Sequence, residues 1–237
     1  MKKTIEGDLF PDFVSEISKS RAESELSVHY QKKRHLDNQH LFHQDQAGYM
    51  DFPVLDKYTG TVPKLLVSFD HARTAVTHSG AFVHFYIDDY QFQRVWLNPQ
   101  NYLDLFRQFE GVLGTDFSQY SNMPYPTRMN NAYKNRLIGR FLQDEGINYI
   151  HNVTWSKPDS YEYSFSGIPQ QSIIAINCTS ILRCDYSKYL WRKGYDEAIR
   201  RLDPLKIIRY GTKMPGEKEE ISIYFENEQL NLLRNGR

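Results

Sequence analysis

The chain has 237 residues, with 29 lysines and arginines against 29 aspartates and glutamates. This length suits one substantial hydrophobic core, and the balanced charge gives no overall attraction to nucleic acid or to an anionic membrane. No apolar run approaches the ~20 residues that span a bilayer, and the first ten residues lack the apolar centre of a secretory signal. We therefore expect a cytoplasmic protein without membrane association.

Composition changes along the chain and predicts three parts. Residues 1–50 are polar and charged, as in an N-terminal extension. Residues 51–215 alternate apolar runs with breaks and should form an α/β core domain, and residues 216–237 should form a peripheral C-terminal segment. The extension holds a basic triplet, residues 32–34, and four histidines, His29, His35, His40 and His43. Two closely spaced histidines do not complete a zinc site, so we predict no metal.

The predicted core opens with two strands. Residues 65–69 and 81–87 are short, rich in β-branched or aromatic side chains, and bounded by polar or glycine breaks. A cap and a first-turn proline at residues 98–99 then precede apolar residues at helical spacing, which predicts a helix ending before Gly111. Residues 112–117 predict the next strand.

Further helices and strands follow, marked by apolar periodicity, first-turn prolines and terminal glycines. In chain order, we expect a helix at 130–145, a strand at 147–155, a short helix from Pro158, a strand at 172–177, a helix at 186–202 with a break at Gly194, and a strand at 206–210.

Serial strand–helix units predict an α/β fold with a mainly parallel sheet, because each parallel connection needs a crossover of about a dozen residues or more. Two architectures are open: an incomplete (β/α) barrel-like sheet, similar to part of a TIM barrel, and an open doubly wound sheet. We favour the first. The strands are too few for a complete barrel unless the N-terminal region or residues 221–225 supply others.

Several short motifs of the core belong together. They are Thr115-Asp116-Phe117-Ser118 after Gly114, Met123-Pro124, Asn131 and Arg136 on the next helix, Trp155, Gly194-Tyr195-Asp196 and Tyr210-Gly211. The set resembles the bacterial and phage domain of unknown function numbered 4417, often carried on mobile elements, over about residues 52–211. The family usually has proline where this chain has Thr115. The resemblance implies a phage or mobile genetic element context, no established activity and no catalytic residues.

Polar residues at the carboxyl ends of the strands are the candidate site, because ligands bind there in both architectures. Carboxylates and amides brought together there can act on a substrate proton. We predict as catalytic Asp116, Asp88, Asn152 and Asn177, and as substrate-binding Arg128, Ser118, Trp155 and Tyr210. Asp116 stands out because a long loop, residues 119–129, follows its strand. Alternatively, these residues only cap helices and turns.

Common enzyme signatures are absent from the sequence: it has no phosphate loop, dinucleotide fingerprint, paired-histidine zinc motif or nucleophile elbow. By analogy with other parallel α/β sheets, we favour an enzyme acting on a nucleotide, nucleic acid or other phosphate-bearing substrate. The alternative is a non-catalytic binding or protein-interaction module of a mobile element. A small molecule or a nucleic acid would be the ligand, while the cofactor and the oligomeric state stay open.

Overall fold

The computed structural model describes residues 37–179 and 184–226. The chain divides into two compact units, residues 1–40 and 41–237, and every strand of the sheet belongs to the second. Predictions for His29, His35 and the triplet 32–34 lie outside the described residues. The three-part division at residues 50 and 215 stays a prediction. No helix among the described residues is long and apolar enough to cross a membrane.

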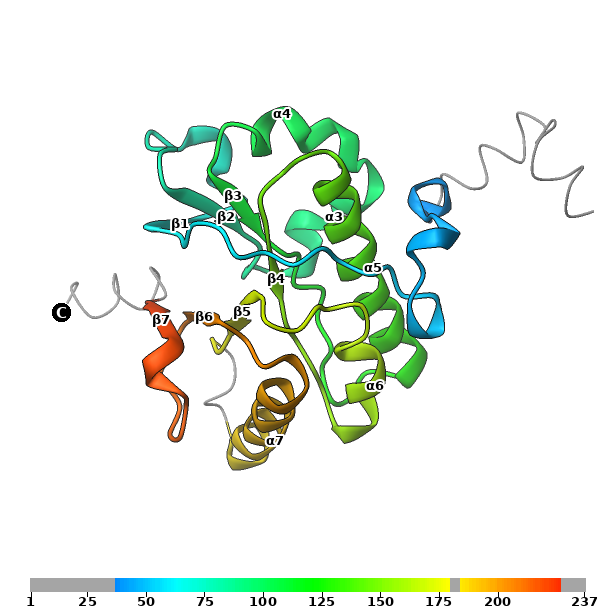
Figure 1. Ribbon diagram of the computed structural model, residues 1–237, viewed down its shortest axis with the longest axis vertical. Helices are drawn as coiled ribbons and strands as arrows, with labels where there is room; N and C mark the ends of the chain where they lie inside the picture. The colour runs from blue at the N-terminus through cyan, green and yellow to red at the C-terminus, as the bar shows by residue number, and fades with distance from the viewer. Residues whose placement is uncertain (1–36, 180–183, 227–237) are drawn as a thin grey trace, which may run out of the picture. The chain divides into compact units, whose positions relative to one another are not determined.

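Within the described residues, seven parallel strands form one sheet in which neighbours in sequence are neighbours in space. They are β1 Leu65–Ser68, β2 Ala81–His84, β3 Gly111–Leu113, β4 Tyr149–Asn152, β5 Ile173–Asn177, β6 Lys206–Tyr210 and β7 Ser222–Phe225. The order never reverses, and the sheet curls into half of a barrel (Figure 1). The structure thus confirms the α/β class and the barrel-like reading, and it lacks the reversal that defines a doubly wound sheet.

Five α-helices in the described residues follow or connect the strands, and they lie around the outside of the curled sheet (Figure 1). They are α3 Asp89–Leu97, α4 Leu103–Phe106, α5 Tyr125–Asp144, α6 Tyr161–Ser164 and α7 Asp185–Leu202. Short 3-10 helices occupy the turns: η1 Gln39–Leu41, η2 Gln44–Gln46, η3 Tyr49–Asp51, η4 Ala72–Thr74, η5 Pro99–Tyr102, η6 Pro158–Ser160 and η8 Glu219–Ile221.

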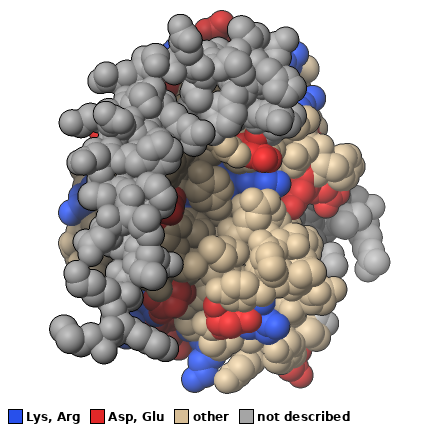
Figure 2. Space-filling model, turned by 90° about the vertical axis from the view of Figure 1, so that its right-hand side faces the viewer, with Lys and Arg blue, Asp and Glu red and all other residues tan. Residues whose placement is uncertain are grey.

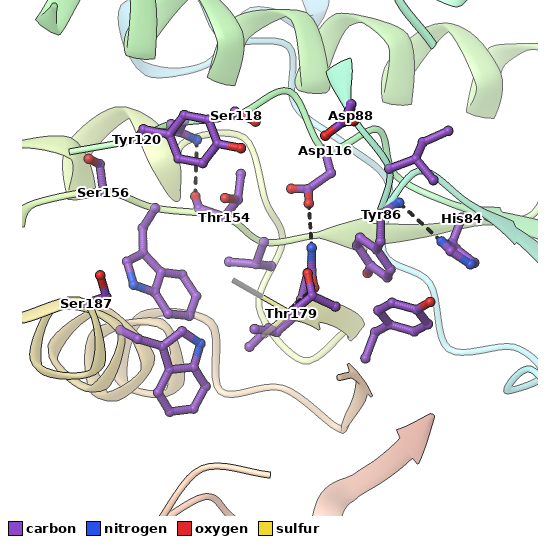
Figure 3. A pocket seen from close by; sticks show the side chains of 18 of the residues that line it. His84, Tyr86, Asp88, Asp116, Ser118, Tyr120, Thr154, Ser156, Thr179 and Ser187 are labelled. Atoms are coloured by element: carbon purple, nitrogen blue, oxygen red, sulfur yellow. Dashed lines mark hydrogen bonds between the residues drawn. The ribbon is translucent and has the colours of Figure 1, made fainter. Parts of the chain in front are cut away.

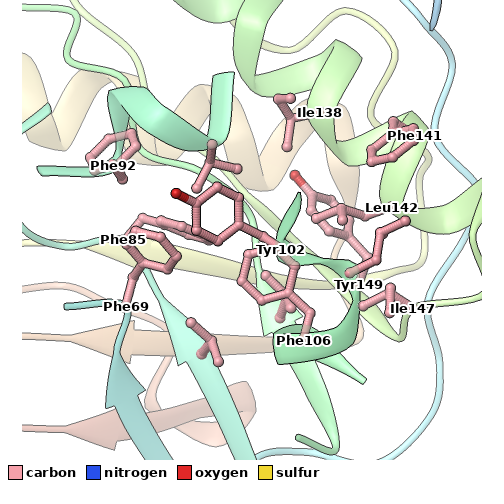
Figure 4. Close-up of a cluster of buried hydrophobic side chains, with 14 of the residues drawn as sticks. Phe69, Phe85, Phe92, Tyr102, Phe106, Ile138, Phe141, Leu142, Ile147 and Tyr149 are labelled. Atoms are coloured by element: carbon pink, nitrogen blue, oxygen red, sulfur yellow. The ribbon is translucent and has the colours of Figure 1, made fainter. Parts of the chain in front are cut away.

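Side chains alternate between the two faces of the sheet, as the period of a strand requires. One face packs against the helices, where aromatic residues of α3, η5 and α4 meet the apolar side of α5 (Figure 4). We call the other face the inner face, and it carries Leu66, Phe82, Leu113, Ile150, Ala175 and Ile208. Each strand contributes side chains to both faces. The strands are therefore nearly continuous apolar runs in the sequence.

The amino end of the inner face is closed by the segment before β1. Tyr58 donates its backbone N–H to Ser172 Oγ at 3.0 Å, and its carbonyl accepts from the Ile173 N–H at 2.8 Å. Tyr58 and Val62 also pack against the apolar side chains of the inner face. This end is therefore filled, which leaves the carboxyl ends of the strands for a site.

Three helix predictions were wrong in detail. Residues 89–97 form α3, for which no helix was expected, and the helix predicted from residue 98 is split into η5 and α4. Buried Phe92, Val95 and Trp96 hold α3 against the core although such residues also favour strands. Helix α7 runs unbroken through Gly194. The glycine avoids the collision that a side chain would make with Trp155.

Helix α5 starts at Tyr125, five residues before the predicted start, with a proline in its first turn. Residues 125–129 are therefore helical, and the long loop that singled out Asp116 is shorter than predicted. The signal was present, since proline is favoured in the first turn of a helix. Residues 222–225, predicted to be part of a peripheral segment, pair with β6 as the edge strand β7.

Candidate functional site at the strand carboxyl ends

A cleft of about 930 Å³ lies at the carboxyl ends of the strands. Its wall is formed by residues that follow β1 to β6 and by the first turns of α7. Among these are His84 at the end of β2, Tyr86 after β2, Asp116 after β3 and Thr179 after β5 (Figure 3). The cleft is where a parallel α/β sheet binds ligands, because loops and helix N-termini meet there.

Asp116 is the centre of a hydrogen-bond network across three adjacent strands. Its Oδ1 accepts from Asn152 Nδ2 at 2.8 Å, and its Oδ2 accepts from Asn177 Nδ2 at 3.0 Å. Asn152 ends β4 and Asn177 ends β5, so parallel pairing brings both amides close to the segment after β3 that carries Asp116. The structure thus brings together three of the four residues predicted to be catalytic.

The orientation of both amides follows from their other partners. Tyr86 donates its hydroxyl to Asn152 Oδ1 at 3.2 Å. Thr179 donates both its backbone N–H and its hydroxyl to Asn177 Oδ1, each at 2.9 Å. Because both amide oxygens are occupied by donors, both NH₂ groups face the carboxyl of Asp116.

The electrostatics of the site follow from burial. Burial raises the pKa of Asp116, the two amide hydrogen bonds oppose that rise, and the nearby charge of Asp89 adds to it. Burial and the neighbouring Asp116 raise the pKa of Tyr86 well above its usual value. Burial lowers the pKa of His84 to about 3. At neutral pH, Tyr86 is therefore protonated, His84 is uncharged, and Asp116 holds its proton more tightly than an exposed aspartate.

Three rings form the aromatic side of the cleft. His84 lies 5.1 Å from Tyr86 and 4.7 Å from Tyr210 between ring centroids, and the two tyrosines are 4.8 Å apart. The backbone N–H of Tyr86 donates to His84 Nδ1 at 3.1 Å, so the proton of the neutral imidazole is on Nε2. His84 ends β2 and Tyr210 ends β6, with three strands between them in the sheet, and both line the cleft.

Trp155 and Trp191 form a second aromatic wall, with ring centroids 6.2 Å apart. Gly194 of α7 makes this packing possible. A Cβ atom at Gly194 would lie 2.0 Å from Nε1 of Trp155, well inside the van der Waals distance. The glycine interpreted as a helix break is therefore a point of close helix packing.

Two other predicted residues line the cleft without joining the Asp116 network. Asp88 is exposed at the N-terminus of α3. Ser118 donates its hydroxyl to Asp89 Oδ1 at 2.8 Å and its backbone N–H to Asp89 Oδ2 at 3.0 Å. The partners of Ser118 are those of a structural cap, and its predicted role in substrate binding stays a prediction.

Arg128, predicted to bind substrate, and Arg136, a residue of the family motifs, both have partners away from the cleft. Arg128 is 2% exposed, lies outside the cleft lining, and donates to both carboxylate oxygens of Asp159 at 2.8 and 2.9 Å. Arg136 is buried and donates to the backbone carbonyls of Ser164 and Ser166. Both guanidinium groups thus fix α5 to the segment around α6, and the predicted binding role of Arg128 gains no support from its position.

The described lining of the cleft contains three aspartates, Asp70, Asp88 and Asp116, and neither lysine nor arginine. Among residues 37–179 and 184–226, no group of three or more His, Cys, Asp or Glu side chains could hold a metal ion. On the described part of the face in Figure 2, acidic and basic side chains are interspersed, and no patch of one sign stands out.

His84, Tyr86 and Trp191 are among the cleft residues that were not nominated from the sequence. The alternation of β2 was a usable signal for the first, since His84 lies two residues after Phe82 and so on the same face. Trp191 lies on α7, far along the chain, and no local pattern connected that helix with the strand ends.

Fold and cleft together define a parallel α/β half-barrel protein with a polar site at the strand carboxyl ends. Residues 44–228 match the family model described as Domain of unknown function (DUF4417), and the chain belongs to this family. This confirms the resemblance expected from the motifs.

Two curated relatives are phage proteins, both called Gene 1 protein. The one from Mycobacterium phage L5 is 35% identical over 156 residues, which are 65% of this chain and 68% of the relative. The one from Mycobacterium phage D29 is 31% identical over 172 residues, 68% of this chain and 63% of the relative. These relatives support the association with phages. No solved structure matches the chain.

Proposed function

We propose that this protein is an enzyme of a phage or mobile element that acts on a small polar substrate in the strand-end cleft, with Asp116 as its acid–base residue. The observation that carries the proposal is the carboxyl group of Asp116, which lines the cleft and is held by an amide from each of two neighbouring strands. Such a group is fixed in position before a substrate arrives, which favours proton transfer.

The electrostatics support this role. A carboxyl whose pKa is raised by burial is a better proton donor and acceptor near neutral pH than an exposed one, because its two protonation states are closer in free energy. Asn152 and Asn177 are positioning residues, since they touch Asp116 through their NH₂ groups. Tyr86 and Thr179 in turn hold the amides, so the whole network serves one carboxyl group.

A test compares turnover by the unmodified chain, by Asp116→Asn and by the matched control Asp104→Asn. Asp104 is an exposed aspartate of α4, outside the cleft lining. Each protein is incubated with pools of nucleosides, nucleotides and short nucleic acids, and products are followed by mass spectrometry. We expect Asp116→Asn to lower turnover roughly 100-fold or more, and Asp104→Asn to leave it unchanged. Unchanged turnover in Asp116→Asn, with its circular dichroism spectrum intact, would refute the assignment.

One observation favours a second candidate, a binding module without turnover. Asp88 is exposed at the cleft wall and makes no hydrogen bond to the described Asp116 network, so a paired acid and base is not formed there. A ligand that binds the cleft tightly and is recovered unchanged would favour this second function over the first.

A further inference from the structure

We propose that the cleft recognises the base of a nucleoside, and that any phosphate attached to that nucleoside stays outside it. The inference deepens the proposed function, since it names the substrate class for the same cleft. It rests on unpartnered polar groups, on ring surfaces and on charge.

Two polar groups of the cleft wall are buried without a hydrogen-bond partner among the described residues: Nε1 of Trp191 and Oγ of Ser156. The Trp191 side chain belongs to a residue only 2% exposed. Buried polar groups in native proteins are nearly always hydrogen-bonded, and an indole N–H can only donate. A ligand with an acceptor atom would complete this wall.

Asp116, in contrast, calls for a ligand that donates hydrogen bonds. Each carboxylate oxygen already accepts one amide N–H, and each keeps a further lone pair for a donor. A ligand with two adjacent N–H groups can be held by both oxygens together. The ligand thus carries donors and acceptors on the same small molecule, as the edge of a nucleobase does.

The aromatic walls favour a flat ligand, and the volume is that of a small-molecule site. The cluster of His84, Tyr86 and Tyr210 and the pair Trp155 and Trp191 both line the cleft. Aromatic side chains bind bases by stacking, and a volume of about 930 Å³ is at the upper end of the range usual for small-molecule sites.

The charge of the cleft lining favours binding of the base and disfavours binding of the phosphate. The described lining holds Asp70, Asp88 and Asp116 but no lysine or arginine, and Arg128, the arginine predicted to bind substrate, is paired with Asp159. Bringing a phosphate among carboxylates without a compensating cation is unfavourable. Of the nucleotide expected from the sequence, the cleft therefore binds the base and not the phosphate.

The test is calorimetry and thermal shift on the full chain with each common ribonucleoside and deoxyribonucleoside, the matching triphosphates, inorganic phosphate and glucose. We expect at least one nucleoside to bind, its triphosphate to bind no more tightly, and phosphate and glucose to give no shift. Tighter binding of the triphosphate, a shift with phosphate or glucose alone, or no shift with any nucleoside overturns the inference.

Variants locate the binding. Trp191→Phe keeps an aromatic ring, though a smaller one, and removes the N–H, so nucleoside affinity should fall roughly tenfold. Trp96→Phe, a buried tryptophan of α3 outside the cleft lining, is the matched control and should not change it. Equal affinity in Trp191→Phe and the unmodified chain contradicts the inference.

Failure of this inference and failure of the proposed enzyme are distinguishable. A nucleoside that binds and is never turned over retains the inference and refutes the enzyme. Turnover of a base-free substrate that depends on Asp116 retains the enzyme and refutes the inference.

Discussion

Replacing Arg209 with methionine should destabilise the protein strongly. The side chains of Arg209 and Glu217 are each only 1% exposed, with Nε of Arg209 3.0 Å from Oε2 and Nη2 2.6 Å from Oε1 of Glu217. Nη1 also donates to the carbonyl of Ile176 at 2.6 Å. Arg209 immediately precedes Tyr210, so the pair fixes the end of β6 behind the cleft. Methionine would keep the apolar stem and leave the Glu217 carboxylate buried without its cation.

The magnitude follows from burial. Removing one partner of a buried ion pair costs about 3–5 kcal/mol, because the remaining charge is desolvated and uncompensated. For a chain of this size, 1 kcal/mol lowers the melting temperature by roughly 2–4 °C, so the expected drop is about 6–20 °C. The control is Arg107→Met, because Arg107 and Glu145 form an exposed pair, 47% and 39% exposed, worth about 0–1 kcal/mol.

Urea and thermal unfolding, followed by circular dichroism, measure both variants. The double variant Arg209→Met with Glu217→Met should recover most of the lost stability, since no unpaired charge stays buried. If Arg209→Met costs no more than Arg107→Met, the carboxylate of Glu217 is being solvated or protonated, and the reasoning from burial fails.

Three further predictions concern the site. Gly194→Ala should lower the melting temperature and alter tryptophan fluorescence, although alanine favours helices by ~1 kcal/mol, because its Cβ would meet Trp155. Asn177→Ala removes a hydrogen bond that lowers the pKa of Asp116, so the acidic limb of a pH profile of ligand binding should move to higher pH. The free energy of unfolding, relative to that of Asp116→Asn, should fall as pH rises from about 4 through the pKa of folded Asp116, because the folded carboxyl holds its proton to higher pH than the unfolded one.

Each of these three predictions has an outcome that would contradict it. An unchanged or higher melting temperature in Gly194→Ala would mean that Trp155 can move without loss. An acidic limb displaced to lower pH in Asn177→Ala, or a stability difference for Asp116→Asn that is constant with pH, would contradict the assigned effect of burial on Asp116.

The sequence by itself determined the class of the fold and the family. Apolar runs of strand length alternate with segments of helical periodicity, and nearby residues alone are enough to recognise this pattern. Strands joined in this way need parallel crossovers. The same logic directed attention to the strand ends, where Asp116, Asn152 and Asn177 do lie together. Helix starts were less certain: the proline in the first turn of α5 was available as a signal, while the short helix α3 carried residues that also suit a strand.

Only the tertiary structure decided which of the strand-end residues meet and which cations are available to them. The amides of Asn152 and Asn177 face Asp116 because Tyr86 and Thr179 occupy their oxygens, and no spacing along the chain encodes that orientation. Arg128 is paired with Asp159, 31 residues away in the sequence, so its guanidinium group holds α5 in place and does not bind a ligand in the cleft. Patterns among neighbouring residues indicate which segments form helices and strands. The direction of a side chain and the neutralisation of a charge depend instead on contacts between distant segments.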